Sequence, residues 1–107
     1  MQRLTMVRYT AKPERADENE QLSRAVFAEL RERRPAGVAY AVCRTGDEFV
    51  HLFINFNADE SGSVTDLASF KAFSAEGPDR HVAPPEIVRL GVNVIEAYGF
   101  ERALASA

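Results

Sequence analysis

Two histidines, together with arginines, tyrosines and asparagines on β-rich segments, are the residues of this chain that could support chemistry. His51 lies in the strand-like run FVHLFINF, and the reference pKa of histidine is close enough to neutral pH for it to accept a proton from a phenol. An arginine could then hold the phenolate, and an asparagine could donate a hydrogen bond to a developing oxyanion. These residue types favour acid–base chemistry on a ligand that carries an aromatic hydroxyl.

Alternation along the expected strands decides which of these side chains share a face of the sheet. The wholly apolar faces of the third and fourth strands consist of Val50, Leu52, Ile54 and Phe56 and of Val88, Leu90, Val92 and Val94. We expect the helices to cover these faces and the small face of the second strand, formed by Ala39, Ala41 and Cys43. A polar set would then share the opposite face: Arg8, Tyr40, His51, Asn55, Arg89 and Asn93.

Each member of this set has an expected role. His51 is the candidate base, and Arg8, Tyr40 and Asn55 would orient the substrate. The binding site would be lined by Phe49, Phe53, Arg89, Asn93 and His81. The alternative is structural: buried polar groups usually find partners, so the same side chains could satisfy one another and fix the register of a dimer.

Four other side chains have simpler interpretations. His81, between Arg80 and the pair Pro84-Pro85, is interpreted as a solvated loop or capping histidine, with a role at a pocket mouth as the alternative. Tyr9 and Tyr98 are interpreted as packing residues with hydroxyls near the surface. Cys43 is the only cysteine, so it forms no internal disulfide, and its apolar neighbours favour a small core residue.

The secondary structure that positions these residues has the order β-α-β-β-α-β. Strands are expected at 3–10, 38–44, 48–56 and 87–98, one helix at 16–34, and a short second helix ends before residue 77. Gly46-Asp47 indicates a tight hairpin, Asp17 with Glu20 resembles a capping box, and 57–65 is expected to be a loop. This order predicts an α+β, ferredoxin-like fold with a four-stranded antiparallel sheet.

Two helices can cover only one face of such a sheet. The other face would expose Phe49 and Phe53, which is a substantial apolar patch. A second copy of the chain, related by a two-fold axis, would cover it. We therefore expect a homodimer that encloses an α/β barrel.

Composition narrows the function classes. With 107 residues, 46% of them hydrophobic, the chain is expected to be one domain spanning 1–107. Thirteen basic residues are scattered among sixteen acidic ones, so no continuous positive surface is expected to hold nucleic acid. No segment approaches the roughly 18 apolar residues of a membrane span, and the N-terminus lacks a secretory pattern. We expect a cytoplasmic protein with no membrane partner.

Motifs for metals and nucleotides are absent from the sequence. Two histidines thirty residues apart and one cysteine give no metal-ligand spacing. The sequence has no glycine-rich phosphate loop and no Gly-x-Ser-x-Gly elbow. We therefore expect no metal and no cofactor.

Three segments carry a resemblance to a known family. They are Phe49-Val50-His51-Leu52, the run from Asp66 to Phe73, and Asp79-Arg80-His81. With the element order, they make the chain from about Leu4 to Phe100 similar to the antibiotic biosynthesis monooxygenase-like family, whose fold is the dimeric α/β barrel. Members oxidise polycyclic aromatic phenols with molecular oxygen and without metal or flavin, whereas others degrade haem.

The resemblance implies a cofactor-independent monooxygenase more than a haem-degrading enzyme. The haem-degrading relatives need an asparagine, a tryptophan and a histidine where this sequence has Val7, Phe56 and His81. Quinone-forming members likewise use a tryptophan and an asparagine that are missing here, so an oxygenase would rely on other groups. The expected substrate is a small aromatic or polyketide-like molecule. The alternative function is a non-catalytic binding or stress-response dimer that sequesters an apolar metabolite in the same cavity.

Overall fold

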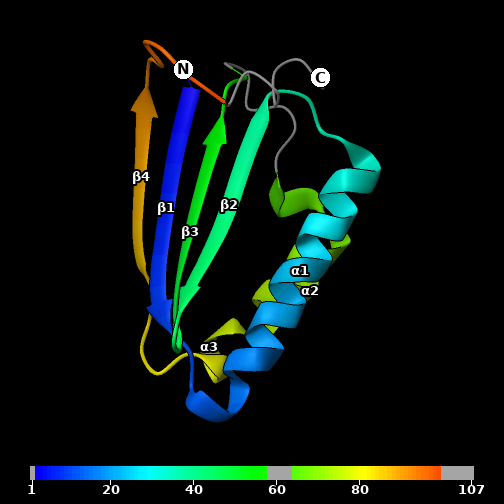
Figure 1. Cartoon of the computed structure of the whole chain (residues 1–107), viewed down its shortest axis with the longest axis vertical. Helices are drawn as coiled ribbons and strands as arrows, with labels where there is room; N and C mark the ends of the chain where they lie inside the picture. Colours follow the sequence, from blue (N-terminus) through cyan, green and yellow to red (C-terminus); the bar gives the residue numbers. More distant parts are fainter. Residues whose placement is uncertain (1, 58–63, 100–107) are drawn as a thin grey trace.

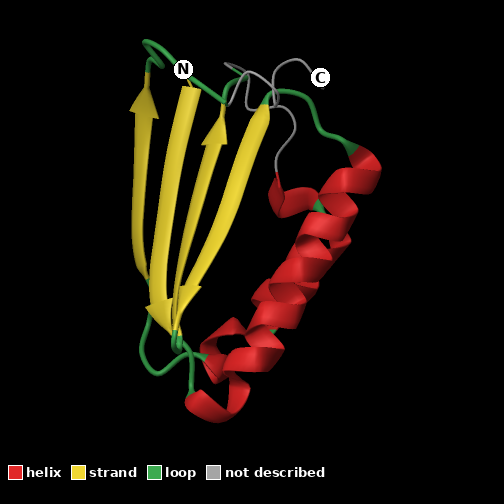
Figure 2. Cartoon of the chain, in the orientation of Figure 1, coloured by secondary structure: helices red, strands yellow, loops and turns green. Residues whose placement is uncertain are grey.

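A four-stranded antiparallel sheet and a layer of helices on one of its faces make up the chain (Figures 1 and 2). The computed structural model describes residues 2–57 and 64–99. The strands are β1 (Gln2–Thr10), β2 (Val38–Thr45), β3 (Glu48–Asn55) and β4 (Glu86–Val92). The helices are α1 (Ala16–Arg33), α2 (Ala68–Ala75) and α3 (Gly77–Arg80), with single 3₁₀ turns at Pro13–Arg15 and Val64–Asp66.

The strand order in the sheet is β2-β3-β1-β4, which confirms the predicted ferredoxin-like arrangement. Gly46 adopts a φ of 60° in the turn between β2 and β3, as a tight hairpin requires. The fourth strand is shorter than predicted, because β4 ends at Val92 and Ile95 is 93% exposed. Most of the loop expected at 57–65 lies outside the described residues.

The helices cover the face opposite to the one predicted. Phe49 and His51 are buried under the helices, whereas Leu52 and its register partners Met6 and Ala41 lie on the open face. Alternation determines which side chains share a face, but it does not determine which face a helix covers. The larger, mixed face fills the space between the two layers, and the helices supply polar partners for it.

The buried side of α1 explains this choice. It consists of Ala16, Asn19, Ser23 and Val26, so two of its four buried residues are polar. Asp17 and Glu20 do not cap the helix; both bind the guanidinium of Arg44 on β2, with N···O distances of 2.9 Å. These contacts attach the start of α1 to the edge of the sheet.

No helix within residues 2–57 and 64–99 is both long enough and apolar enough to cross a membrane.

Candidate functional site

A buried histidine between two tyrosines forms the centre of the candidate site. The Tyr9 hydroxyl is hydrogen-bonded to Nε2 of His51 at 2.8 Å, and the Tyr40 hydroxyl is hydrogen-bonded to Nδ1 at 2.7 Å. The three side chains come from β1, β2 and β3. They share one face because Tyr9 pairs with Phe49 and Tyr40 pairs with Phe53, and Phe49 and Phe53 lie two residues before and after His51 on β3. Both ring nitrogens of His51 are therefore occupied by phenol groups.

The hydrogen bonds continue from Tyr9 into the helical layer. Asn19 Nδ2 on α1 donates to the Tyr9 hydroxyl at 2.8 Å, and Arg80 Nε on α3 donates to Asn19 Oδ1 at 3.1 Å. Arg80 Nη2 also donates to the carbonyl oxygen of Phe73 at 2.6 Å. The Arg80 side chain is fully buried, and among the residues that the structure describes no carboxylate forms an ion pair with it. We call the series Arg80–Asn19–Tyr9–His51–Tyr40 the buried polar chain.

Aromatic rings surround the buried polar chain. The ring of His81 stacks on Tyr9 with centroids 3.9 Å apart, and Phe49 stacks on the same ring at 5.6 Å. Phe73 from α2 lies 5.6 Å from His51, and Phe53 meets Tyr40 edge-on at 5.7 Å. This environment excludes water and lowers the local dielectric constant, so each polar contact in it is strengthened.

Burial shifts the pKa values of the central groups. Desolvation lowers the pKa of His51 to about 4, with a smaller contribution from His81. Desolvation also raises the pKa of Tyr9 to about 12, against a hydrogen bond from Asn19, and raises the pKa of Tyr40. At neutral pH the site therefore holds a neutral imidazole and two protonated phenols.

Two buried nitrogen atoms remain without a hydrogen bond within the described part of the chain: Arg80 Nη1 and His81 Nε2. The Arg80 guanidinium lies over the ring of Phe73, 4.9 Å from its centroid, and the carboxylates of Glu18 and Glu76 act on its charge only from beyond ion-pair distance. No group of three metal-ligating side chains occurs among residues 2–57 and 64–99.

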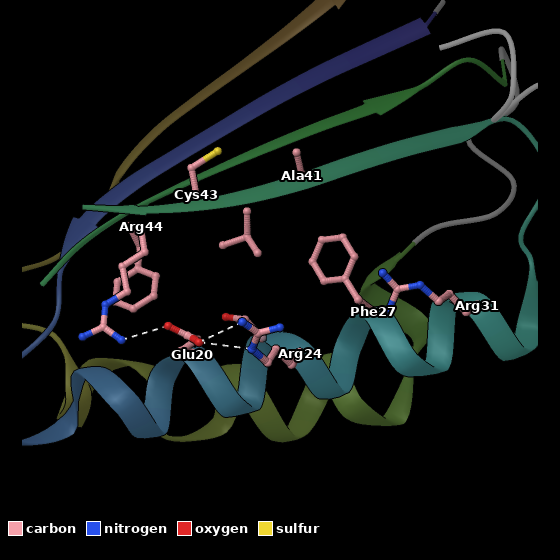
Figure 3. Close-up of a pocket in the computed structure, with 10 residues that line it drawn as sticks. Glu20, Arg24, Phe27, Arg31, Ala41, Cys43 and Arg44 are labelled. Carbon is pink, nitrogen blue, oxygen red and sulfur yellow. Dashed lines mark hydrogen bonds and ion pairs between the residues drawn. The ribbon is translucent and has the colours of Figure 1, made fainter. Parts of the chain in front are cut away.

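A cleft of about 460 Å³ lies between α1 and β2, next to this cluster (Figure 3). Its apolar lining includes Phe27, Val42 and Phe49, and its charged lining includes Arg24, Arg31, Arg44 and Glu20. Phe27 packs against the ring of Tyr40 with centroids 4.8 Å apart, which connects the cleft to the buried polar chain. Figure 3 shows Cys43 and Ala41 pointing away from α1, toward the open face of the sheet.

Comparison with solved structures places this architecture among known ones. A "putative antibiotic biosynthesis monooxygenase" from Caulobacter crescentus is 20% identical, with a TM-score of 0.70 over 86% of this chain and 91% of that one. A protein of the same description from Nitrosomonas europaea is 14% identical, with a TM-score of 0.71 over 90% and 94% of the two chains. A Mycobacterium tuberculosis protein gives 0.73 at 14% identity over 92% and 100%. The chain has the fold of these proteins.

The similarity is one of structure. The sequence matches no protein-family model and no curated protein. The resemblance to the antibiotic biosynthesis monooxygenase-like family is therefore confirmed in the fold, and the chemistry must be argued from the side chains of this chain.

Several predicted site residues do lie together. Tyr40 and His51 are in contact, and Phe49, Phe53 and Asn55 share their face of the sheet. Asn55 is buried four residues along β3 from His51, and its Oδ1 accepts a hydrogen bond from the backbone N–H of Asn57. Asn55 therefore contributes to the end of β3, at a distance from the centre of the cluster.

The prediction that Arg8 shares a face of the sheet with His51 is wrong. Arg8 pairs with Val50 across β1 and β3, so its side chain lies on the open face, where its Nε binds Glu48 Oε1 at 2.7 Å. Arg89 pairs with Thr5 and shares the face of His51 as predicted, but β4 lies at the sheet edge far from α1 (Figure 1). Arg89 and Asn93 are therefore exposed and outside the helical cover.

Three further interpretations are corrected by the structure. His81 does cap the end of α3, through its backbone N–H to the carbonyl oxygen of Gly77, but it is not a solvated residue, because it stacks on Tyr9 and its Nε2 is buried. The Tyr9 hydroxyl is not near the surface, because it lies in the buried polar chain. Cys43 is exposed on the open face and is no core residue.

Sequence reasoning missed Asn19 and Arg80. A signal for Asn19 was present, since Asn19 and Ser23 stand in the same helical stripe as Val26, and polar residues in a buried stripe need polar partners. Arg80 is the last residue of the four-residue helix α3 and gives no comparable pattern.

Proposed function

We propose that the chain is a cofactor-independent monooxygenase that acts on a small aromatic or polyketide-like phenol. One observation carries the proposal: a neutral His51 held between two tyrosine hydroxyls, in aromatic surroundings, beside a cleft of about 460 Å³ lined by Phe27 and Phe49. Flat apolar ligands suit such a lining. The similarity of the fold to proteins described as antibiotic biosynthesis monooxygenases supports the reaction class.

The reaction needs no reductant other than the substrate. The phenol loses a proton to the solvent, the electron-rich phenolate gives electrons to dioxygen, and the carbon opposite the hydroxyl gains one oxygen atom. The second oxygen atom leaves as water with two hydrogens from the substrate, so a quinone forms. The protein contributes by binding the ring, excluding water and stabilising the phenolate.

Tyr40 is the group that we assign to the phenolic oxygen of the ligand. His51 cannot reach a ligand directly, because both of its nitrogens bind tyrosine hydroxyls. Tyr40 is only half-buried and packs directly behind Phe27, which lines the cleft. His51 therefore influences the ligand only through its hydrogen bond to Tyr40, and it is not the directly acting base that the sequence suggested.

The positive charges at the cleft suit an anionic oxygen. Arg24 and Arg44 share Glu20, whereas no ion pair of Arg31 is found among the described residues. Arg31 is exposed at the cleft beside Phe27 (Figure 3). A phenolate in the cleft would gain from this excess of positive charge.

We also propose that two copies associate through the open face of the sheet. Met6, Val88 and Leu90 on this face are each at least 39% exposed, and register places Leu52 and Ile54 beside them. A contiguous apolar patch of this kind marks an interface. The surface differs from the predicted one, since Phe49 and Phe53 lie under the helices.

The experiment is oxygen uptake with a hydroxylated anthracene by the purified protein. We expect uptake in the native chain and a loss of at least tenfold in Tyr40→Phe, which corresponds to the removal of one charge-assisted hydrogen bond. Tyr98→Phe makes the same chemical change at a side chain that is 94% exposed, and it should leave the rate unchanged.

Two outcomes would contradict the proposal. Equal rates in Tyr40→Phe and the native chain would remove Tyr40 from the site. Tight binding without oxygen uptake in the native chain would favour the alternative, a binding protein for an aromatic metabolite.

A further inference from the structure

We propose that Arg80 is a positioning residue that sets the direction of every hydrogen bond in the buried polar chain, so that Tyr40 presents a hydrogen-bond donor to the ligand oxygen. The inference concerns the tautomer of His51 and stands on the geometry alone. Only its ligand, an oxyanion, rests on the function proposed above.

The direction begins at Arg80 because a guanidinium has donors and no acceptor. Its Nε lies 3.1 Å from Asn19 Oδ1, so the amide of Asn19 must turn its oxygen toward α3. The Nδ2 group of Asn19 then faces Tyr9, 2.8 Å from the hydroxyl. Arg80 thereby fixes which end of the amide meets Tyr9.

The orientation of Asn19 determines the donor and acceptor roles of Tyr9. The Tyr9 oxygen accepts from Asn19 Nδ2, so its own hydrogen needs an acceptor, and a buried donor left unpaired costs free energy. In the described part of the chain the remaining hydrogen-bond partner of this hydroxyl is His51 Nε2, at 2.8 Å. Tyr9 therefore donates to Nε2, which must carry no proton.

The tautomer of His51 follows. A neutral imidazole carries one proton, so the proton is on Nδ1, and Nδ1 donates to the Tyr40 oxygen at 2.7 Å. The hydrogen of Tyr40 then has no acceptor among residues 2–57 and 64–99 and is available to a ligand. Hydrogen bonds aligned in one direction polarise one another, so the buried charge of Arg80 strengthens Tyr40 as a donor to an anionic oxygen.

The tautomer can be read directly by NMR. In a long-range ¹H–¹⁵N correlation spectrum of the ¹⁵N-labelled protein at pH 8, a protonated ring nitrogen resonates far upfield of a bare one. The His51→Gln variant identifies the signals of His51, because only His81 remains. We expect His51 with a protonated Nδ1 and a bare Nε2. A proton on Nε2 of the native chain would overturn the inference.

Asn19→Asp is the variant that should reverse the donor-to-acceptor direction of the hydrogen bonds from residue 19 to Tyr40. A carboxylate keeps the contact with Arg80 but offers Tyr9 an acceptor in place of a donor. Tyr9 would then donate to residue 19, accept from His51 Nε2–H, and leave Nδ1 to accept from Tyr40. We expect Nε2 to gain a proton in this variant, whether or not Nδ1 also keeps one. An unchanged spectrum would overturn the inference.

Ser23→Ala is the matched control on the same helix. Ser23 Oγ donates to the backbone carbonyl of Asn19 at 2.9 Å, so the variant alters the surroundings of residue 19 without touching the side-chain contacts. The tautomer of His51 should not change. If it did, local packing rather than the direction of the hydrogen bonds would determine the tautomer.

Ligand binding tests the second half of the inference separately. With 4-nitrophenolate as the probe, we expect Asn19→Asp to weaken binding about tenfold, the value of one charge-assisted hydrogen bond, while binding of nitrobenzene is unchanged. Equal weakening of both probes would contradict donation by Tyr40. If the native chain binds neither probe, the proposed ligand class is wrong, and the NMR result still decides the direction of the chain.

Discussion

The Tyr9 hydroxyl lies 2.8 Å from Nε2 of His51, in the closed space between the sheet and the helices. The charged or titratable groups around this contact are Tyr40 from β2, His81 after α3, and Arg80 on α3. None of these groups carries a negative charge at neutral pH. Burial therefore disfavours the protonated imidazole, and no neighbour compensates.

This relationship predicts that the protein loses stability as the pH falls from about 6.5 to about 4. Burial lowers the pKa of His51 to about 4 from 6.5, so the unfolded chain binds a proton in this window and the folded chain does not. The free energy of unfolding should fall by on the order of 3 kcal/mol across the window. Urea unfolding at a series of pH values measures the change.

The control for this prediction is His51→Gln, which cannot titrate. Exposed carboxylates such as Glu18 titrate in both proteins, so their contribution cancels in the comparison. The native chain should show the steeper dependence between pH 4 and pH 6.5. Identical slopes in the two proteins would mean that burial does not lower the pKa of His51.

Removing the Tyr9 hydroxyl should destabilise the protein. Tyr9→Phe leaves Asn19 Nδ2 and His51 Nε2 without their buried partner, and each unpaired group costs about 1 to 3 kcal/mol. Thermal and urea unfolding should show a loss of roughly 2 kcal/mol or more. The same change at the exposed Tyr98 should stay within about 0.5 kcal/mol of the native chain. A small effect at Tyr9 would indicate that water replaces the hydroxyl.

The sequence predicted the helices and strands of this fold, but it did not predict which face of the sheet the helices cover. Hydrophobic periodicity and the Gly46-Asp47 turn located the two main helical segments and the hairpin, because local interactions determine them. Alternation also grouped Tyr40 with His51 correctly. It could not show that this mixed face lies under the helices, since that depends on how Asn19 and Arg80 complement His51 and Tyr9.

The sequence predicted only the part of the candidate site that local structure brings together. His51 and Tyr40 stand on neighbouring strands, so the hairpin brings them together. Asn19 and Arg80 are 61 residues apart and meet only in the tertiary structure. Arg8 does not belong to the site, because its side chain lies on the open face of the sheet and binds Glu48 there.

A charge on the open face should dissociate the proposed dimer. Leu90→Asp places a carboxylate among the apolar residues of that face, and burying an unpaired charge costs several kcal/mol. We expect native mass spectrometry to record two chains for the native protein and one chain for the variant. Ile95→Asp, at a residue beyond β4 that is 93% exposed, should remain a dimer. A native protein with the mass of one chain would contradict the proposed association.

The thiol of Cys43 reports on the same surface without a change of charge. Cys43 is exposed in a single copy and pairs with Val50 in register, which places it on the open face. If two copies cover this face, a thiol reagent such as Ellman's reagent should modify Cys43 slowly in the dimer. Dilution or Leu90→Asp should raise the rate at least tenfold, because modification would then need no dissociation. Equal rates in the dimer and in Leu90→Asp would show that the copies associate through another surface, and the open face would need a different partner.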